Sequence, residues 1–388
     1  MHAVPVVRLA GFYFAYFGFV GAFAPYFSLY LQSLGMSAIE IGVLLSLMQL
    51  VRIFAPSFWA GRADRTGARA GLLRLALAAG TVSCIGILLT QSFAGLFVTL
   101  ALLGFFTSAA LPLFETLIFA HLRDDLGRYG LLRVWGSIGF IVAVLGVGAI
   151  LDAWPVQVLR MLLFVPLVAS LAFVATLPDA HAEPRHGSDQ PVWTVLRRPE
   201  VALLFGACFM MAVAHGPLYT FFSIYLADAG YDKSLIGMLW ALGVVAEIVV
   251  FMRMPRLLAR YSTGKILVAS FAFAVARFAL IGWGVSSLPV LIVAQVFHAA
   301  TFGAYHAAAL GLVNAWFPGG QRARGQALYA SLSFGAGGMV GGMASGLAWE
   351  SLGAAWTFTA ASACAALGLI LAAATATMWA RGRTIQPR

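Results

Sequence analysis

The sequence reads FSLYLQSLGMSAIEIGVLLSL at residues 27–47 and FSIYLADAGYDKSLIGMLWAL at residues 222–242, a segment that begins 195 positions later. Nine of the 21 aligned positions are identical, which exceeds chance for two apolar segments, and Gly35 aligns with Gly230. The two halves of the chain are therefore expected to be repeats of one another, with equivalent elements in the same order.

The composition excludes a water-soluble globular protein. Of the 388 residues, 62% are hydrophobic and only 10% are charged, whereas roughly 25% of the residues in a soluble domain are charged. The 24 Lys and Arg and the 14 Asp and Glu are too few to cover the surface of a soluble chain of this length. Most of the chain is expected to lie in lipid.

Apolar runs long enough to cross a bilayer recur along the whole chain. A bilayer core of about 30 Å needs about 20 apolar residues in a helix. Twelve such runs lie at residues 8–32, 41–60, 71–91, 95–121, 131–151, 157–177, 201–226, 235–253, 264–285, 289–316, 327–349 and 354–380. Lipid offers no partner for an unpaired backbone amide, and the runs lack the alternation of barrel strands, so each is predicted to be a helix. The predicted fold class is an all-α membrane protein with twelve transmembrane helices in two six-helix bundles.

The longest polar stretch divides the twelve runs six and six. This stretch, residues 178–200, is predicted to be a cytoplasmic linker between an N-terminal bundle, residues 1–177, and a C-terminal bundle, residues 201–380. Residues 381–388 are predicted to be a cytoplasmic tail. Arg and Lys cluster in alternate gaps, at residues 62–74, 123–133, 185–198, 253–265 and 322–324. The positive-inside rule then predicts that both termini are cytoplasmic. The protein is expected to be a multi-pass protein of the inner membrane.

Several other classes of function are not expected. The net charge of +10 arises mainly from Lys and Arg in these gaps and in the termini. The sequence has no basic run with interleaved aromatic residues, so nucleic-acid binding is not expected. The sequence has no phosphate-binding loop of GxxxxGK spacing, so transport driven by ATP is not expected. It also has no convincing pair of nucleophile and base, so an enzyme is not expected. His298 and His306 lie about 12 Å apart along one helix without a cysteine or carboxylate pair, so neither a metal nor another cofactor is expected. The three cysteines lie in apolar runs and are predicted to be free thiols.

Four short stretches carry a family resemblance. Residues 61–69, GRADRTGAR, resemble the cytoplasmic signature of the major facilitator superfamily. Residues 129–137, YGLLRVWGS, residues 243–247, GVVAE, and residues 295–302, QVFHAATF, are similar to the phenylpropionate permease family and more distantly to the lactose/proton symporter. The resemblance covers nearly the whole chain and implies proton-coupled uptake of a small polar or anionic solute.

The sequence departs from the lactose symporter at three places. Thr301 stands where that symporter has a carboxylate, and Phe140 replaces the tryptophan that stacks on the sugar. Glu247 lies about one helical turn away from the corresponding carboxylate, relative to Arg277. Transport of galactosides is therefore not expected, and the departures agree with the phenylpropionate-type relatives.

Ionisable side chains inside a span are costly unless they are paired or face water, so each is a candidate functional residue. Arg133 follows Glu115 by 18 residues, after the short return of a helical hairpin, so the two side chains can meet. The resemblance implies that both bind substrate, with Arg133 offering a two-pronged fork to a carboxylate or to hydroxyls. In the alternative, Arg133 extends to the membrane interface and Glu115 is a structural acceptor. The other predicted substrate-binding residues are Tyr16, Phe23, Phe140, His215, Tyr219 and Tyr305.

A second group of residues is predicted to handle the proton. Gln295, His298, Phe302, Tyr305 and His306 recur at helical spacing and share one stripe of the tenth run. Histidine titrates near neutral pH and can relay a proton, and a desolvated carboxylate can be neutralised by a proton or held ionised by an arginine. Glu247 is the predicted proton carrier and Arg277 its partner; a purely structural ion pair is the alternative. The predicted proton-coupling residues are Arg52, Glu247, Arg277, His298 and His306.

The sequence as a whole predicts a monomeric secondary transporter that imports a small organic acid, such as an aromatic monocarboxylate, together with a proton. Uptake of a nucleoside or a sugar and efflux by antiport remain open, as does a membrane sensor that transports nothing. In the eleventh run, glycines at small-x-x-x-small spacing predict a close helix contact rather than a chemical site.

Overall fold

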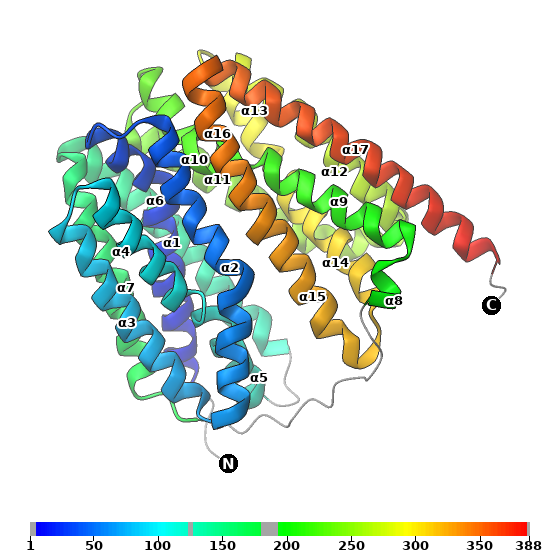
Figure 1. The fold of residues 1–388 in the computed structure, drawn as a ribbon, viewed down its shortest axis with the longest axis horizontal. Helices are drawn as coiled ribbons and strands as arrows, with labels where there is room; N and C mark the ends of the chain where they lie inside the picture. Colours follow the sequence, from blue (N-terminus) through cyan, green and yellow to red (C-terminus); the bar gives the residue numbers. More distant parts are fainter. Residues whose placement is uncertain (1–4, 123–126, 180–192, 386–388) are drawn as a thin grey trace. The chain divides into compact units, whose positions relative to one another are not determined.

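The computed structural model describes residues 5–122, 127–179 and 193–385. Every regular element in these ranges is helical, and no strand occurs in them (Figure 1). The predicted all-α class is therefore confirmed. Bilayer solvation gives the physical reason, because a helix satisfies its own backbone donors and acceptors without water.

The helices cover nearly all of the described chain. The first seven are α1 (Val6–Ser33), α2 (Ala38–Thr66), α3 (Arg69–Leu89), α4 (Phe93–Thr107), α5 (Ala110–Leu122), α6 (Gly127–Ala153) and α7 (Leu159–Ala175). The others are α8 (Trp193–Leu196), α9 (Pro199–Ala214), α10 (Gly216–Asp228), α11 (Lys233–Arg260), α12 (Thr263–Trp283), α13 (Leu288–Val296), α14 (Tyr305–Trp316), α15 (Arg322–Ala330), α16 (Gly338–Leu352) and α17 (Ala354–Ile385). Two π-helical segments, Ala299–Ala304 and Ser331–Gly337, join α13 to α14 and α15 to α16.

All twelve predicted spans are helical. Eleven helical stretches within the described residues are long and apolar enough to cross a membrane. The remaining predicted span, residues 327–349, is also helical, because α15 continues through the π-helical segment Ser331–Gly337 into α16.

By their internal contacts, the residues fall into two compact units. The first contains α1 to α7 together with residues 226–241, and the second contains the chain from residue 185 to Tyr225 and from Leu242 onward. The first unit thus includes the beginning of α11, which the division by sequence assigned to the C-terminal bundle. Residues 180–192, most of the predicted linker, lie outside the described residues, as do residues 386–388 of the predicted tail.

Two polar contacts hold the start of α11 in the first unit. The two carboxylate oxygens of Asp152, at the end of α6, accept hydrogen bonds from the backbone nitrogens of Lys233 at 2.8 Å and Ser234 at 2.9 Å. The Tyr26 hydroxyl lies 2.7 Å from the carbonyl oxygen of Val144 and 3.2 Å from that of Lys233. A carboxylate at a helix N-terminus satisfies otherwise unpaired N–H groups and complements the helix dipole.

Local sequence explains both ends of α2. The Ser37 hydroxyl accepts a hydrogen bond from the Glu40 nitrogen at 3.2 Å, and the Glu40 carboxylate accepts one from the Ser37 nitrogen at 2.9 Å. This reciprocal capping box fixes the first turn. At the other end, Gly67 adopts a φ of 68°, a left-handed conformation that glycine takes at little cost. The turn into α3 follows directly.

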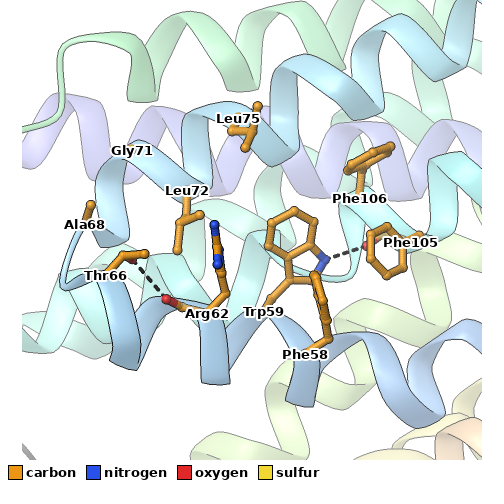
Figure 2. Close-up of a pocket in the computed structure, with 10 residues that line it drawn as sticks. All are labelled: Phe58, Trp59, Arg62, Thr66, Ala68, Gly71, Leu72, Leu75, Phe105 and Phe106. Carbon is orange, nitrogen blue, oxygen red and sulfur yellow. Dashed lines mark hydrogen bonds between the residues drawn. The ribbon is translucent and has the colours of Figure 1, made fainter.

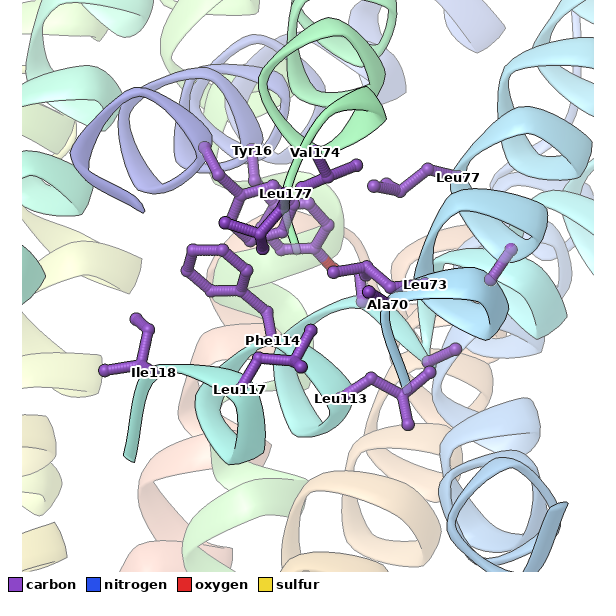
Figure 3. Packing of buried hydrophobic residues seen from close by; sticks show 14 of the residues in the cluster. Tyr16, Ala70, Leu73, Leu77, Leu113, Phe114, Leu117, Ile118, Val174 and Leu177 are labelled. Carbon is purple, nitrogen blue, oxygen red and sulfur yellow. The ribbon is translucent and has the colours of Figure 1, made fainter. Parts of the chain in front are cut away.

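A buried hydrophobic cluster in the first unit sets the orientation of α5 (Figure 3). Leu113, Phe114, Leu117 and Ile118 of α5 are all 3% exposed or less. The Phe114 ring lies 3.8 Å from that of Phe12, centroid to centroid. Because this face of α5 is committed to the cluster, the neighbouring position 115 is turned away from it.

Glycines allow two pairs of helices to approach closely. A Cβ atom at Gly21 of α1 would lie 2.6 Å from the Phe140 carbonyl oxygen of α6. A Cβ atom at Gly139 of α6 would overlap the Phe14 carbonyl oxygen of α1. In the second unit, a Cβ atom at Gly341 of α16 would lie 2.6 Å from the Val213 carbonyl oxygen. Small residues let backbones touch in lipid, where apolar burial drives helix association weakly. The predicted packing role of the glycines in the eleventh run is consistent with this contact.

We expect Gly139→Ala to destabilise the first unit by about 1–3 kcal/mol, because the new methyl group collides with backbone rather than with a movable side chain. Gly146→Ala is the matched control, since it lies on the same helix and its added Cβ would meet nothing within 4 Å. The measurement is the apparent unfolding temperature of purified protein in detergent. Equal unfolding temperatures for the two variants would contradict the packing argument.

Candidate functional site

Arg133 lies among aromatic rings of the first unit. Its guanidinium carbon is 4.3 Å from the centroid of Phe17 and 5.4 Å from that of Tyr13, both on α1. A Cβ atom at Gly136 would lie 2.7 Å from Arg133 Nη1, so the side chain runs back along α6 over that glycine. Position 136 is deeper in the span than position 133. The Arg133 side chain therefore runs toward the middle of α6 (Gly127–Ala153), and its role in binding substrate stays a prediction.

Glu115 and Arg133 belong to the same cluster but do not form a direct ion pair. Among the described residues, no carboxylate lies within 4.0 Å of the Arg133 guanidinium. The Tyr129 hydroxyl, one turn before Arg133 on α6, donates to Glu115 Oε1 at 3.4 Å. The hydrogen bond that Glu115 accepts in this hairpin therefore comes from Tyr129. The buried Tyr13 hydroxyl beside them has no hydrogen-bond partner among the described atoms.

The other predicted residues of the first unit are more dispersed. Tyr16 is buried, its hydroxyl donates to the Thr107 carbonyl at 3.2 Å, and its ring meets Phe17 edge-on at 5.9 Å. Phe23 stacks on Phe27 with centroids 4.5 Å apart, two turns from the arginine cluster. The structure therefore places Tyr16 beside the Arg133 cluster but leaves Phe23 in a separate aromatic stack.

Two further predicted residues of the first unit, Phe140 and Arg52, lie in surroundings of a different kind. The Phe140 backbone carbonyl forms the close contact with Gly21 that joins α6 to α1. Arg52 is exposed, and its Nη1 donates to Gln49 Oε1 one turn earlier on α2, at 3.2 Å. Neither residue belongs to the group of side chains around Arg133, and both roles stay predictions.

Arg277 is the centre of a buried polar network in the second unit. Its side chain is 1% exposed. It donates to the Ala294 carbonyl at 3.0 Å, to Gln295 Oε1 at 3.2 Å and to Thr301 Oγ1 at 2.9 Å. His215 Nε2, at the junction of α9 and α10, lies 3.5 Å from Arg277 Nη1, and the His215 ring stacks near Tyr219 at 6.0 Å.

This arrangement differs from the predicted pairing of Glu247 with Arg277. All the hydrogen-bonding partners of the Arg277 guanidinium in the described chain are neutral, and no carboxylate lies within ion-pair distance. Glu247 Oε2 instead lies 3.6 Å from His298 Nε2. The close approach of α11 at Gly243, where a Cβ atom would be 3.3 Å from the His298 ring, explains why histidine rather than arginine reaches Glu247.

The predicted polar stripe of the tenth run divides at the π-helical segment. The rings of His298, Phe302 and His306 form a stack, with successive centroids 5.3 Å and 6.3 Å apart. His306 Nδ1 lies 3.1 Å from the Tyr329 hydroxyl. Tyr305 instead points its hydroxyl toward the Cys208 carbonyl, at 3.5 Å. An extra residue in a π-helical turn shifts the side chains that follow it, so regular helical spacing does not describe this stripe.

Two buried polar atoms beside Arg277 have no hydrogen-bond partner among the described atoms. They are Gln295 Nε2 and His298 Nδ1. Buried polar groups in proteins are nearly always satisfied, by protein or by water, and the cost of leaving them unpaired is larger in lipid. These two atoms lie close to a guanidinium that has only neutral hydrogen-bond partners among the described residues.

The sequence analysis missed several members of these clusters. Tyr13, Phe17 and Tyr129 were not assigned, although Phe17 follows the assigned Tyr16 directly and Tyr129 lies one turn before the assigned Arg133. Thr301 was noted only as a missing acid, yet it is an acceptor for Arg277. Within the described residues, no group of three or more His, Cys, Asp or Glu side chains is arranged to hold a metal ion. The three cysteines are free.

We expect Thr301→Val to lower stability by about 1–3 kcal/mol, because it removes an acceptor from a buried guanidinium that has no charged partner. Thr81→Val is the matched control: Thr81 is also buried, but its hydroxyl donates only to the Leu77 carbonyl of its own helix. The apparent unfolding temperature in detergent is the measurement. A loss for Thr81→Val as large as that for Thr301→Val would contradict the special role of the Arg277 network.

The described residues form long apolar helices with buried charged and polar side chains inside them, which is the architecture of a multi-pass membrane protein. The model of the MFS_1 like family matches residues 6–360. The chain belongs to this family, and it is a secondary transporter of the major facilitator superfamily, not an enzyme.

Individual relatives differ in what they carry. The chain is 28% identical over 327 residues to the probable 3-phenylpropionic acid transporter of Escherichia coli strain K12, covering 83% of this chain and 86% of that protein. It is 28% identical over 271 residues to the maltose permease of Geobacillus stearothermophilus, covering 69% of this chain and 68% of that protein. The crystal structure of the nucleoside transporter NupG matches with a TM-score of 0.80 at 19% identity, over 97% of this chain and 99% of that chain. The last likeness shows a common fold.

Proposed function

We propose that this transporter imports a small aromatic monocarboxylate together with a proton, by alternating access in the inner membrane with both termini in the cytoplasm. The observation that carries the proposal is Arg133, whose guanidinium lies against Phe17 and Tyr13 and, among the residues that the structure describes, has no carboxylate within ion-pair distance. A guanidinium fork binds a carboxylate with two parallel hydrogen bonds. Aromatic side chains at the same place suit a ring attached to that carboxylate.

The balance of intramembrane charges supports an anionic substrate. Arg52, Arg133 and Arg277 carry three positive charges, and Glu115 and Glu247 carry two negative charges. With neutral histidines, one positive charge remains in excess. An unpaired charge inside a membrane protein is costly, and a bound monocarboxylate neutralises it. The relationship to a probable 3-phenylpropionic acid transporter supports the same class of substrate.

The Glu247 and His298 pair is the proposed proton site. At 3.6 Å, one proton on the pair gives either two neutral groups or an ion pair, and loss of that proton leaves a net negative charge. Coupling requires that the proton affinity of this pair differ between the outward-facing and inward-facing states. His306, which stacks in the same series of rings, is a proposed relay toward Tyr329.

A neutral polyol is the second candidate substrate. The relationship to a maltose permease supports it, and so do the unpaired Gln295 Nε2 and the neutral acceptors around Arg277, which suit hydroxyl groups. Sugars and nucleosides lack a carboxylate, so they would gain nothing from the unpaired charge of Arg133. Efflux by antiport uses the same residues with the opposite direction of net movement.

The test is uptake of radiolabelled 3-phenylpropionate into proteoliposomes with and without an inward proton gradient. The neutral form of a weak acid crosses lipid unaided and accumulates on the alkaline side, so protein-free vesicles with the same gradient supply the baseline. We expect protein-dependent accumulation only with the gradient, abolished by a protonophore and by excess unlabelled substrate. The corresponding alcohol, 3-phenylpropanol, should compete weakly, because it lacks the carboxylate. Accumulation of labelled maltose or nucleoside instead, or protein-dependent export, would overturn the proposal.

A further inference from the structure

An open groove in the first unit lies apart from all the candidate transport residues. It has a volume of about 540 Å³ and is bounded by α2, α3 and α4 (Figure 2). None of the residues predicted to bind substrate or proton lines it. A molecule bound in this groove would therefore not contact the residues predicted to bind the transported solute.

Most of the groove is apolar. Phe58 of α2 and Leu75 of α3 are 55% and 58% exposed along its sides. Phe105 and Phe106 of α4 complete the lining. The one polar aromatic atom in this lining is already satisfied, because the Trp59 indole nitrogen donates to the Phe105 carbonyl at 3.0 Å (Figure 2). The inner part of the groove thus offers hydrocarbon contacts and no further hydrogen bond from that indole.

One end of the groove carries a positive charge. Arg62 lies in the last turns of α2, and its guanidinium lies between Leu72 and Trp59 (Figure 2). Its backbone carbonyl accepts a hydrogen bond from Thr66 at 3.0 Å, but no carboxylate of the described residues lies within 4.0 Å of its guanidinium. The nearby Asp64 pairs with Arg69 at 3.4 Å instead. A cation at the end of a membrane helix lies at the level of lipid headgroups.

We propose that the groove binds one anionic phospholipid, with an acyl chain along Phe58, Leu75 and the α4 aromatics and the headgroup phosphate on Arg62. The charge complementarity commits the site to this occupant. A neutral detergent or a sterol gains only the apolar contacts, whereas a phosphate diester also satisfies the guanidinium. The exposed apolar side chains and the helix-end cation match the two parts of a lipid in their order along the membrane normal.

The lipid test uses purified full-length protein, stripped of lipid and titrated with phosphatidylglycerol or phosphatidylcholine, with bound lipid counted by native mass spectrometry. We expect tighter binding of phosphatidylglycerol than of phosphatidylcholine. Arg62→Gln should weaken phosphatidylglycerol binding about fivefold, in line with the strength of one basic residue at a membrane surface. It should weaken phosphatidylcholine binding much less, because the choline cation of that lipid offsets its own phosphate. Arg65→Gln, also exposed near the end of α2 but outside the groove lining, is the matched control.

A second pair of variants tests the apolar part. Gly71 lines the groove, and a Cβ atom there would meet Ala68 at an ordinary 3.7 Å, so Gly71→Leu fills the groove without a backbone clash. It should weaken binding of both lipids, whereas Gly61→Leu, whose Cβ would meet nothing within 4 Å and which does not line the groove, should not. Equal effects of Arg62→Gln and Arg65→Gln, or of the two leucine variants, would overturn the site. Displacement of phosphatidylglycerol by 3-phenylpropionate would likewise overturn it, in favour of a substrate site.

Discussion

Glu247→Gln should retain exchange of substrate across the membrane and lose accumulation driven by a proton gradient. Glutamine resembles the protonated glutamate in shape and charge but cannot release a proton. In the variant, the side chain that lies 3.6 Å from His298 has no acidic proton to exchange. The transporter can still change its orientation with substrate bound. It has no means of linking that change to proton movement.

The measurement compares counterflow with gradient-driven uptake in the same preparation of vesicles. Counterflow should stay within about threefold of the unmodified protein, while the protein-dependent accumulation ratio falls to about one, because an exchanger without coupling equilibrates its substrate. Glu200→Gln is the matched control: the same chemical change in the second unit, at a glutamate paired with Arg198 in the first turn of α9. Full uphill accumulation by Glu247→Gln would remove Glu247 as the coupling residue and transfer the role to His298 or Glu115.

Arg133→Lys should weaken substrate binding about tenfold to a hundredfold, the equivalent of losing one or two hydrogen bonds to a charged group. The charge is retained, so the expected loss arises from geometry. A lysine ammonium cannot form the planar two-pronged contact with a carboxylate, and it cannot lie flat against the Phe17 ring 4.3 Å away.

Equilibrium binding of radiolabelled 3-phenylpropionate to purified protein measures this effect without the complications of transport. Arg74→Lys makes the same exchange at an arginine whose Nη1 donates only to the backbone carbonyls of Ala175 and Leu177, at 3.1 Å and 3.5 Å. That control should bind substrate normally. Unaltered affinity in Arg133→Lys would mean that Arg133 of α6 only packs against the aromatic rings of α1. The substrate site would then have to be sought around Arg277.

The structure places Glu247 beside His298 and not beside Arg277, the partner predicted from the sequence, and this alters the expected coupling mechanism. A Glu247 paired with arginine would stay ionised, whereas a Glu247 beside the His298 imidazole can hold a proton between the two side chains. The buried Arg277 guanidinium then does not balance the charge of Glu247. Its neutral hydrogen bonds to Gln295 and Thr301 leave its charge uncompensated, which makes it a second point at which an anionic solute could be stabilised.

The helical spans were predictable because the solvent imposes them locally. In lipid, each backbone amide must bond within its own segment, so a run of about 20 apolar residues becomes a helix whatever lies elsewhere in the chain. The π-helical interruption in the eleventh run did not change that outcome. The capping box at Ser37 and the left-handed Gly67 are equally local, and they set the ends of α2 from its own residues.

The partners of the charged residues were only partly predictable. Sequence spacing brought Glu115 and Arg133 into one hairpin, but the hydrogen bond from Tyr129 to Glu115 depends on how α5 is rotated by its buried face. Spacing alone also favoured Arg277 as the partner of Glu247. The approach of α11 at Gly243 and the register of the helix that carries Gln295 and His298 gave the opposite result.

The sequence by itself determined the all-α class, the approximate positions of the spans, the internal sequence repeat and the identity of the ionisable residues inside the spans. These follow from composition and from interactions within one segment. Only the tertiary structure decided that Glu247 meets His298, that Arg277 has neutral partners and that α2, α3 and α4 leave a groove beside Arg62. The physical reason is that such contacts depend on the rotation and separation of helices distant in sequence, which side-chain packing sets to within a few ångströms, and no local pattern encodes a distance of that kind.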